Sequence, residues 1–327
     1  MKNIALIDFD SKIPNLALMK LSTHFKEQGD NVNLIRSEYS AYSKKKKQLV
    51  FDATNYDEVH ASVIFTSNKG LLKVVNCNNV VLGGTGEDIN KELPKEIDSL
   101  SPDYSIYPEN DKSFGFITRG CIRNCYFCFV PKKEGKIREY STVDEIVKHK
   151  KVIFMDNNIL GWHKHKDIFK QILDKDIKLT FNQGLDIRLI NDNNAYLLSL
   201  MDYMGEYIFA FDDIKNKDII EEKYQIVKKY IKREWGTKFY VYCHPDMHPS
   251  AIRQRVDWCK DNKALPYIMR DFSCYTNDNS NFYTDIASWC NQPGLFKNMP
   301  FEDFLNKRTK NQNRINQTLS MWNNQCT

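Results

Sequence analysis

Three closely spaced cysteines are the residues of this chain whose type and spacing most directly indicate chemistry. They lie in the run Gly115-Phe-Ile-Thr-Arg-Gly-Cys121-Ile-Arg-Asn-Cys125-Tyr-Phe-Cys128, which has the spacing C-x3-C-x2-C. Iron-sulfur clusters are held by cysteine thiolates, and a four-iron cubane normally takes four of them. Three ligands without an obvious fourth would leave one iron open to a small molecule. The spacing therefore indicates a catalytic cluster.

Other metal sites built from cysteines remain as alternatives. A structural zinc site would complete its tetrahedron with a fourth Cys or His, usually from a second closely spaced pair, and no such pair follows Cys128. A ferredoxin-like electron carrier would also need a fourth cysteine. The alternative from a different functional class is a non-catalytic binding protein in which a metal ion stabilises the loop.

The other six of the nine cysteines are isolated along the sequence, and a lone cysteine is usually a small buried hydrophobe. They are Cys77, Cys243, Cys259, Cys274, Cys290 and Cys326. The four between residues 243 and 290 recur at similar intervals. A second cluster held by these four is therefore a further hypothesis beside simple burial.

The cysteine loop resembles the signature loop of the radical S-adenosylmethionine superfamily, in which an aromatic residue stands before the last cysteine, as Phe127 does here. In that family the open iron chelates S-adenosylmethionine, and one electron cleaves it to methionine and a 5'-deoxyadenosyl radical that abstracts hydrogen from the substrate. The resemblance implies a 4Fe-4S cluster on Cys121, Cys125 and Cys128, with Phe127 near the adenine. It also implies an electron donor such as flavodoxin or ferredoxin.

Strand-like and helix-like runs alternate through the rest of the chain and predict an α/β fold. The strands are expected at Phe114 to Thr118, Lys151 to Met155, Lys178 to Phe181, Tyr207 to Phe211, Lys238 to Tyr242 and Pro266 to Met269. The helices are expected at Val143 to Lys150, Lys166 to Leu173, Asn194 to Met201, Asp218 to Lys232 and Pro249 to Lys260. Six such units predict a partial (β/α)6 TIM-like barrel, with functional groups at the C-terminal ends of the strands. The resemblance implies that this barrel is the radical S-adenosylmethionine core.

Several predicted strand ends are polar and would line a site in this geometry. They read Asp156-Asn157-Asn158, Asn182-Gln183-Gly184, Asp212-Asp213 and His244. Such residues are also common in turns and helix caps, which is the alternative for each of them.

The resemblance assigns tentative roles to these strand ends. It implies that Asp156, Asn157 and Asn158 contact the methionine end of S-adenosylmethionine, although this chain lacks the usual Gly-Gly-Glu-like motif. It places Asp212 at the ribose hydroxyls. We expect the loop with Gln183 to face the cofactor or substrate.

The same loop contains Asp186 and Arg188, whose roles stay open. Arg188 would either face the site or pair on the surface with Asp186 or Asp192.

The region before the cysteines reads as a small Rossmann-like, doubly wound domain. It opens with a strand at Ile4 to Ile7, a helix at Leu16 to Gln28 and a strand at Val32 to Ile35, and strand-like runs follow at Ala61 to Phe65 and Val80 to Leu82. The glycines at 83–86 lack a Walker lysine and predict a tight turn. The expected domains are therefore residues 1–105, a core of 106–290, and a polar, basic extension of 291–327.

A Rossmann-like domain ahead of the cysteine loop resembles two radical S-adenosylmethionine subfamilies. One is the cobalamin-dependent group, but neither His24 nor His60 stands in an Asp-x-His-x-x-Gly motif, so cobalamin is not predicted. The other is the methylthiotransferases, whose cluster loop continues much like Val130-Pro131-Lys132-Lys133-Glu134-Gly135. Methylthiotransferases hold a second cluster on three cysteines of the first domain, where this chain has Cys77 alone. The likeness makes nucleic acid a candidate substrate.

Composition and charge are those of a folded protein outside the membrane. Of 327 residues, 42% are hydrophobic and 27% charged, and no run approaches the ~18 apolar residues that would span a bilayer. The N-terminal MKNIALIDFD lacks the features of a signal peptide, so a cytoplasmic location is expected. A net charge of +5, with a run at Lys44 to Lys47, permits a polyanionic partner without requiring one.

Overall fold

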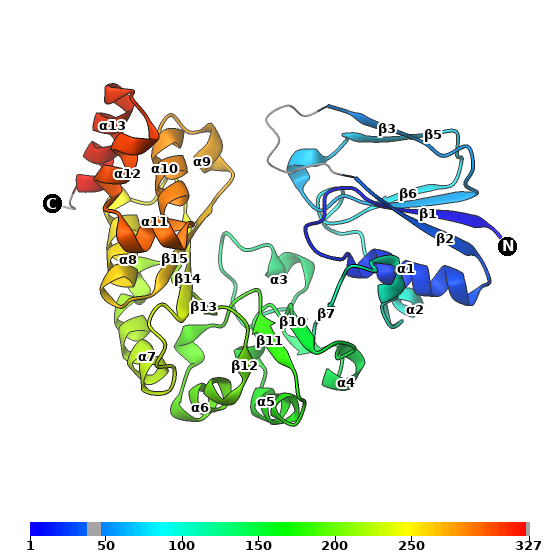
Figure 1. Ribbon diagram of the computed structural model, residues 1–327, viewed down its shortest axis with the longest axis horizontal. Helices are drawn as coiled ribbons and strands as arrows, with labels where there is room; N and C mark the ends of the chain where they lie inside the picture. The colour runs from blue at the N-terminus through cyan, green and yellow to red at the C-terminus, as the bar shows by residue number, and fades with distance from the viewer. Residues whose placement is uncertain (38–46, 325–327) are drawn as a thin grey trace. The chain divides into compact units, whose positions relative to one another are not determined.

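The computed structural model describes residues 1–37 and 47–324, and it divides the chain into two compact units, Met1–Gly115 and Phe116–Thr327 (Figure 1). The sequence predicted a boundary after residue 105 and a separate extension from residue 291. Instead, the residues after 290 belong to the second unit. Of the basic run at 44–47, only Lys47 lies among the described residues, and Cys326 lies outside them.

The first unit contains one four-stranded parallel sheet with the strand order β2-β1-β4-β6, and a separate parallel pair, β3-β5. Its elements are β1 (Asn3–Asp8), α1 (Leu16–Glu27), β2 (Asn31–Arg36), β3 (Leu49–Asp52), β4 (Glu58–Ser62), β5 (Leu72–Val75), β6 (Val80–Gly83), α2 (Lys95–Asp98) and β7 (Lys112–Gly115), with short 3-10 turns at Thr66–Asn68 and Tyr104–Ile106.

Strand β1 shows how this sheet acquires two packed faces, since successive side chains of a strand point to opposite sides. Ile4 and Leu6 pack in one cluster with Leu18 of α1, whereas Ala5 and Ile7 pack in another with side chains of β3 and β5. Figure 1 shows the three layers, with α1 on one face of the sheet and β3-β5 on the other. A doubly wound arrangement would have helices on both faces. Here the connections after β2 and β4 contain strands instead.

The second unit alternates strands and helices. Its strands are β8 (Thr118–Arg119), β9 (Arg138–Glu139), β10 (Lys151–Phe154), β11 (Lys178–Phe181), β12 (Asp202–Tyr203), β13 (Tyr207–Ala210), β14 (Thr237–Cys243) and β15 (Leu265–Arg270). Its helices are α3 (Val130–Lys133), α4 (Val143–Ile146), α5 (His165–Leu173), α6 (Asp192–Leu200), α7 (Lys217–Tyr230), α8 (Pro249–Asp261), α9 (Ser273–Thr276), α10 (Ser280–Cys290), α11 (Pro293–Asn298), α12 (Phe301–Arg308) and α13 (Gln312–Asn323). Short 3-10 turns lie at Ile159–Gly161, Ile187–Leu189 and Ile214–Asn216.

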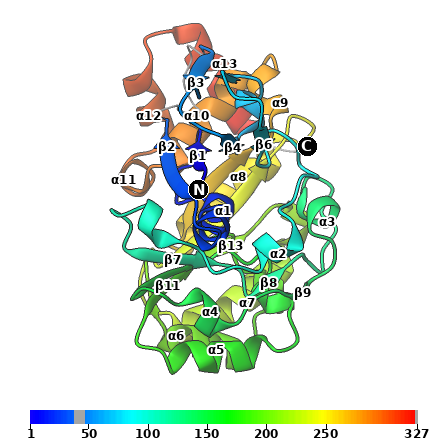
Figure 2. The ribbon, with the colours of Figure 1, turned by 90° about the vertical axis from the view of Figure 1, so that its right-hand side faces the viewer.

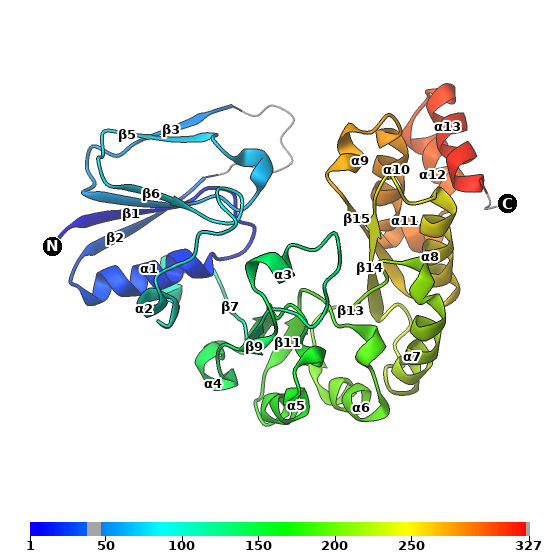
Figure 3. The same ribbon diagram turned by 180° about the vertical axis from the view of Figure 1, so that it is seen from behind.

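Apart from the antiparallel pair β8-β9, the paired strands of the second unit run in parallel, as helical connections allow. Strands β10, β11 and β12 are neighbours in that order, and so are β13, β14 and β15. A parallel bridge between Leu185 and Phe209 joins the two groups just beyond β11. In Figures 1 and 3, α3 lies on the opposite side of β10 and β11 from α5 and α6.

One large apolar cluster fills the second unit and includes Phe154, Phe181, Phe209 and Phe239, one from each of four parallel strands. The chain is thus a mixed α/β protein with parallel sheets, as the sequence predicted. Figure 2 shows the strands and helices of each unit from a second direction. Among the described helices, none is both long enough and apolar enough to cross a bilayer.

Candidate functional site

The three cysteines lie in a single loop whose two ends are held together at its base. Strand β8 pairs with β9 in antiparallel fashion, with Thr118 opposite Glu139. Next to this pair, the backbone N–H of Cys121 donates to the carbonyl oxygen of Gly135 at 3.2 Å. The segment between them carries Cys121, Cys125, Cys128 and helix α3. We call residues 120–137 the cysteine loop.

Gly120 permits this closure because no other residue fits its position. Its φ of +86° lies in the left-handed region that favours glycine, and an added Cβ would stand 2.4 Å from the carbonyl oxygen of Lys136. The two ends of the cysteine loop therefore meet backbone against backbone immediately before the first cysteine.

The polar residues that follow β10 all bind the N-terminal end of the cysteine loop or the strand leading into it. The carboxylate of Asp156 accepts the backbone N–H groups of Ile117 (3.3 Å) and Thr118 (2.6 Å), and the Thr118 hydroxyl (2.8 Å). The Asn157 amide oxygen accepts the N–H of Gly120 at 3.0 Å. The Asn158 amide nitrogen donates to Sγ of Cys121 at 3.5 Å.

These hydrogen bonds give Asp156 and Asn157 a different role from the predicted contact with the cofactor. Asp156 is 1% exposed and both of its oxygens are engaged, so it acts as an anchor of the loop rather than as part of an open surface. Burial raises the pKa of Asp156 to about 6, although its hydrogen bonds to Thr118 and Ile117 oppose this shift. Asn157 is likewise engaged through its oxygen.

Asn158 keeps a free acceptor in the protein interior. The residue is 4% exposed, and its Oδ1 has no hydrogen-bond partner. Buried polar atoms are rarely left in this condition, because an unmade hydrogen bond costs about 1–3 kcal/mol. The observation fits a bound group that donates a hydrogen bond, such as an ammonium, beside Cys121.

A buried carboxylate ties the cysteine loop to the end of β11. Asp186, whose side chain is 7% exposed, accepts from Nε of Arg123 at 2.8 Å and from Nε of Arg188 at 2.7 Å. The two arginines hold the pKa of Asp186 below its ordinary value despite its burial. Arg188 therefore pairs with Asp186, which was one of the two alternatives expected for it, but the carboxylate is buried and also anchors the cysteine loop through Arg123.

A second ion pair braces the base of the cysteine loop. Arg119 donates to Oε1 of Glu134 at 2.6 Å, and the Glu134 side chain is 7% exposed. The guanidinium carbon of Arg119 also lies 4.7 Å from the ring centre of Phe116 and 5.0 Å from that of Tyr140. The ion pair and the two rings fix the chain on both sides of the cysteines.

Phe127, which the resemblance placed near an adenine, stacks on Tyr242 at the end of β14. The ring centres lie 4.1 Å apart with an interplanar angle of 16°. Tyr242 donates to Oδ2 of Asp271 at 2.8 Å, which fixes its ring. The far side of the cysteine loop is thus held by an aromatic stack, whereas Tyr126 stays 76% exposed.

The three thiols lie near enough to act on one another electrostatically. Burial raises the pKa of Cys125, as do Asp212, Cys128 and Cys121, while Arg188 opposes them. The pKa of Cys128 is raised by burial and by Cys121 and Asp212. Converging thiolates beside a carboxylate repel each other, and a positively charged centre would relieve that repulsion. The donor set therefore fits an iron-sulfur cluster.

Within the described part of the chain, no group of three or more His, Cys, Asp and Glu side chains is arranged to hold a single metal ion. Ligands around one zinc ion, at 2.3 Å each, would stand only about 4 Å apart. Thiolates around a cubane bind different iron atoms and stand further apart.

Asp212 lies close to the cysteines and to the buried guanidinium of Arg255. Burial raises its pKa to about 6, and the positive charges of Arg255 and Arg188 oppose this. Arg255 is completely buried and donates to the carbonyl oxygens of Phe211 (3.0 Å), Asp212 (2.8 Å) and Tyr242 (2.9 Å). Arg255 thereby binds the carboxyl ends of β13 and β14 together.

Some predicted residues are not brought into this network. Gln183 is exposed, and Gly184 beside it takes a φ of +92°. The cysteines at 243, 259, 274 and 290 are each at most 1% exposed within the apolar cluster. Burial raises the pKa of Cys243 to about 12 and that of Cys274 to about 11, as expected of packed thiols.

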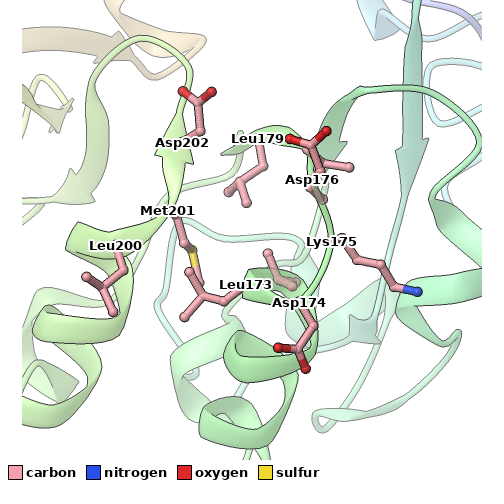
Figure 4. A pocket seen from close by; sticks show the side chains of 10 residues that line it. Leu173, Asp174, Lys175, Asp176, Leu179, Leu200, Met201 and Asp202 are labelled. Atoms are coloured by element: carbon pink, nitrogen blue, oxygen red, sulfur yellow. The ribbon is translucent and has the colours of Figure 1, made fainter.

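A pocket of about 360 Å³ lies at the opposite ends of the strands (Figure 4). Asp174, Asp176, Leu179, Met201 and Asp202 are among its lining residues, which follow α5 and α6 or begin β11 and β12. Parallel α/β barrels carry their functional groups at the other, carboxyl ends. The cysteine loop is bound at those carboxyl ends, so this pocket is separate from the candidate site.

Comparison with known proteins shows the fold. Neither a protein-family model nor a curated protein matches the chain. Among solved structures, a match is described as "Structure of Cobalamin-dependent S-adenosylmethionine radical enzyme OxsB with aqua-cobalamin bound", with a TM-score of 0.51 and 13% identity over 92% of this chain. The chain spans 57% of that protein's length. The mixed α/β fold is thus shared with a protein that carries a radical enzyme's description.

Proposed function

We propose that this chain is a radical S-adenosylmethionine enzyme whose 4Fe-4S cluster is held by Cys121, Cys125 and Cys128. The observation that carries the proposal is a C-x3-C-x2-C loop that hydrogen bonds to Asp156, Asn157 and Asp186 hold at the carboxyl ends of parallel strands. The fold shared with a radical S-adenosylmethionine enzyme supports it. The architecture we propose is a partial (β/α)6 barrel that begins with the strand expected at Phe114 to Thr118, preceded by a Rossmann-like domain.

When bound, the cluster and S-adenosylmethionine would supply a 5'-deoxyadenosyl radical for hydrogen abstraction. The chain's own residues would hold the loop and orient the cofactor. Asp156 and Asn157 fix the approach to Cys121 through backbone N–H groups. The unpartnered Oδ1 of Asn158 would accept from the cofactor's ammonium group. Asp212, which follows β13, would accept from the ribose hydroxyls, as the resemblance implies.

The proposal leaves out cobalamin, which the matched enzyme binds. His60 stands in no lower-ligand motif, and its Nε2 lies 2.8 Å from Oε1 of Glu58. A reductant such as flavodoxin or ferredoxin would supply the electron. A cytoplasmic location would keep the cysteine thiols reduced, and in the described residues they are free.

Nucleic acid is the substrate class we propose, on the likeness of the cysteine loop to that of methylthiotransferases. Tyr126 and Phe129, which are 76% and 54% exposed, would offer rings on which unpaired bases stack. RNA added to the cleavage assay would raise the yield of 5'-deoxyadenosine if it contains the substrate. An unchanged yield with RNA and DNA would argue for another class.

Anaerobic reconstitution with iron and sulfide tests the proposed activity. We expect a brown protein that, once reduced with dithionite, converts S-adenosylmethionine to 5'-deoxyadenosine and methionine. Cys125→Ala should lose the iron and the cleavage together, because two thiolates cannot hold a cubane. Cys77→Ala is the matched control, since Cys77 lies in the first unit, and it should keep both.

Two outcomes would overturn the proposal. One is cleavage that persists in Cys125→Ala. The other is a colourless, zinc-loaded wild-type protein that leaves S-adenosylmethionine intact, which would support a metal-stabilised binding protein instead.

A further inference from the structure

The side chain of Asn158 makes a contact that cofactor binding alone does not explain. Its Nδ2 lies 3.5 Å from Sγ of Cys121 and donates to it, while its Oδ1 has no partner. An isolated amide could rotate to place either atom on the sulfur. A thiolate accepts hydrogen bonds and repels a carbonyl oxygen, so the contact with Cys121 requires the NH2 group.

Sγ of Cys121 also receives a backbone donor. The N–H of Arg123 donates to it at 3.3 Å, and that geometry follows from the turn of the cysteine loop itself. The Asn158 contact, by contrast, comes from the end of β10, 37 residues away. It therefore depends on one side chain, which a substitution can remove while the loop backbone stays intact.

Burial strengthens the hydrogen bond that the amide nitrogen of Asn158 donates. Asn158 is 4% exposed, and a hydrogen bond is stronger where water is excluded. Reduction adds one negative charge to a cluster and its thiolates. A donor to one of those sulfurs stabilises the reduced state more than the oxidised state, and hydrogen bonds to the sulfurs are one determinant of cluster potentials.

Resting on the proposed function, we propose that Asn158 is a positioning residue that raises the reduction potential of the cluster through its hydrogen bond to Cys121. The strand end where it stands reads Asp-Asn-Asn in this chain. Its first two members fix the loop backbone, and the third acts on the sulfur. One short segment thus places the cluster and adjusts how readily it accepts an electron.

The test is a redox titration of reconstituted full-length protein, followed by the electron paramagnetic resonance signal of the reduced cluster. Asn158→Leu keeps the approximate shape of the side chain and removes the donor. We expect the equilibrium constant for reduction to fall about three- to tenfold; a tenfold fall is a shift of about 59 mV for one electron. Asn158→Asp places a carboxylate beside the sulfur and should lower the potential further.

A matched control separates a change at the sulfur from a general loss of stability. Asn291 is partly buried and exchanges two hydrogen bonds with the backbone of Ile268, so Asn291→Leu is the same substitution away from the cysteine loop. Its cluster potential should equal that of the wild type. Thermal unfolding of each protein shows that the comparison is made between folded chains.

The outcomes distinguish this inference from the proposed function. A wild-type protein that assembles a cluster and cleaves S-adenosylmethionine, together with an Asn158→Leu potential equal to that of the wild type, would overturn the role of Asn158 alone. A potential lowered equally in Asn158→Leu and Asn291→Leu would also overturn it. A wild-type protein that assembles no cluster would overturn the proposed function as well, and iron and sulfide analysis identifies that case.

Discussion

At the scale of single residues, the approach to Cys121 is held by three polar side chains from a distant part of the chain. Asp156, Asn157 and Asn158 follow β10, and each contacts the chain between Ile117 and Cys121. Their partners lie 37 to 39 residues away along the chain, so only the fold determines which groups they bind. The local sequence shows that a polar residue follows a strand, but it does not show which group that residue contacts.

Four residues of the site escaped sequence reasoning for the same reason. They are Arg123 and Glu134, which lie in the cysteine run and the segment after it, and Tyr242 and Arg255, and each acquires its role from a partner in another element. A charged residue inside the cysteine run was the one available signal, because Arg123 separates two of the proposed ligands. It indicates a charge near the cluster, and the partner Asp186 follows from the structure alone.

The buried carboxylate of Asp156 predicts a pH dependence of stability. Because burial raises its pKa from 3.8 to about 6, the folded chain binds this proton more tightly than the unfolded chain does. The stabilising contribution is therefore complete below about pH 4 and is lost as the pH rises through about 6. At about 1.36 kcal/mol per pKa unit, the loss is about 3 kcal/mol.

Asp156→Asn does not titrate, so the stability advantage of the wild type over this variant should shrink by about that amount between pH 4 and pH 7. Urea unfolding followed by tryptophan fluorescence measures it, since Trp162, Trp235, Trp258, Trp289 and Trp322 all lie in the second unit. Asp176→Asn is the control: the pKa of the exposed Asp176 is lowered by Lys150, so its difference from the wild type should be constant above pH 5. A pH-independent difference for Asp156→Asn would contradict the assignment.

At the scale of elements, hydrophobic periodicity predicted the parallel strands closely, because each strand is buried and apolar. Five expected strands agree with observed ones within two residues at each end. The expected ranges 151–155, 178–181, 207–211, 238–242 and 266–269 correspond in order to β10, β11, β13, β14 and β15. The strand expected at 114–118 is divided between β7 and β8.

Helix α4 was predicted to be longer than it is. It begins with a capping box on Thr142 and Glu145, as its sequence indicates, but it ends at Ile146 and Val147 is extended. The following residues are basic and lead directly into β10 at Lys151. The chain must be extended by Lys151, where β10 begins, so the helix ends before it.

The closure of the cysteine loop is a property of that element and predicts unequal effects of two similar substitutions. Gly120 and Gly135 both have positive φ, at +86° and +72°. An added Cβ at Gly120 would stand 2.4 Å from the carbonyl oxygen of Lys136, whereas nothing lies within 4 Å of one at Gly135. Gly135→Ala should therefore cost about 1 kcal/mol of backbone strain, and Gly120→Ala at least about 3 kcal/mol.

The measurement for this pair is iron retained per chain after reconstitution, together with the tryptophan-detected unfolding midpoint. Gly120→Ala should retain far less iron than Gly135→Ala, because separating the ends of the cysteine loop moves Cys121. Equal retention in the two variants would show that the close approach at Gly120 has no part in holding the ligands.

At the scale of the whole molecule, the segment after residue 290 was expected to be a polar, basic extension, and it is instead three helices of the second unit. Phe301, Phe304 and Leu305 are buried on one face of α12, at the spacing i, i+3, i+4. That spacing was visible in the sequence, but the high polar content obscured it. Asp285 of α10, completely buried, pairs with Arg308 at 2.8 Å and Arg314 at 2.5 Å.

Substitution of Trp322 in α13 tests how much the C-terminal helices stabilise the second unit against unfolding. It is 7% exposed, its ring lies 5.0 Å from that of Phe301 and 6.1 Å from that of Trp289, and Arg253 donates to its carbonyl oxygen. Removing a buried aromatic side chain from such a cluster costs about 3–5 kcal/mol. Trp322→Ala should therefore lower the free energy of unfolding of the second unit by that amount.

The fluorescence of the four remaining tryptophans reports this unfolding in urea. Phe272→Ala is the control, because it removes an aromatic side chain that is 72% exposed. That control should change the free energy of unfolding by less than about 0.5 kcal/mol. If Trp322→Ala changed the free energy of unfolding no more than Phe272→Ala does, the C-terminal helices would be dispensable for the stability of the second unit. A loss confined to Trp322→Ala means that the last helix completes the core around which the parallel strands, and with them the anchors of the cysteine loop, are assembled.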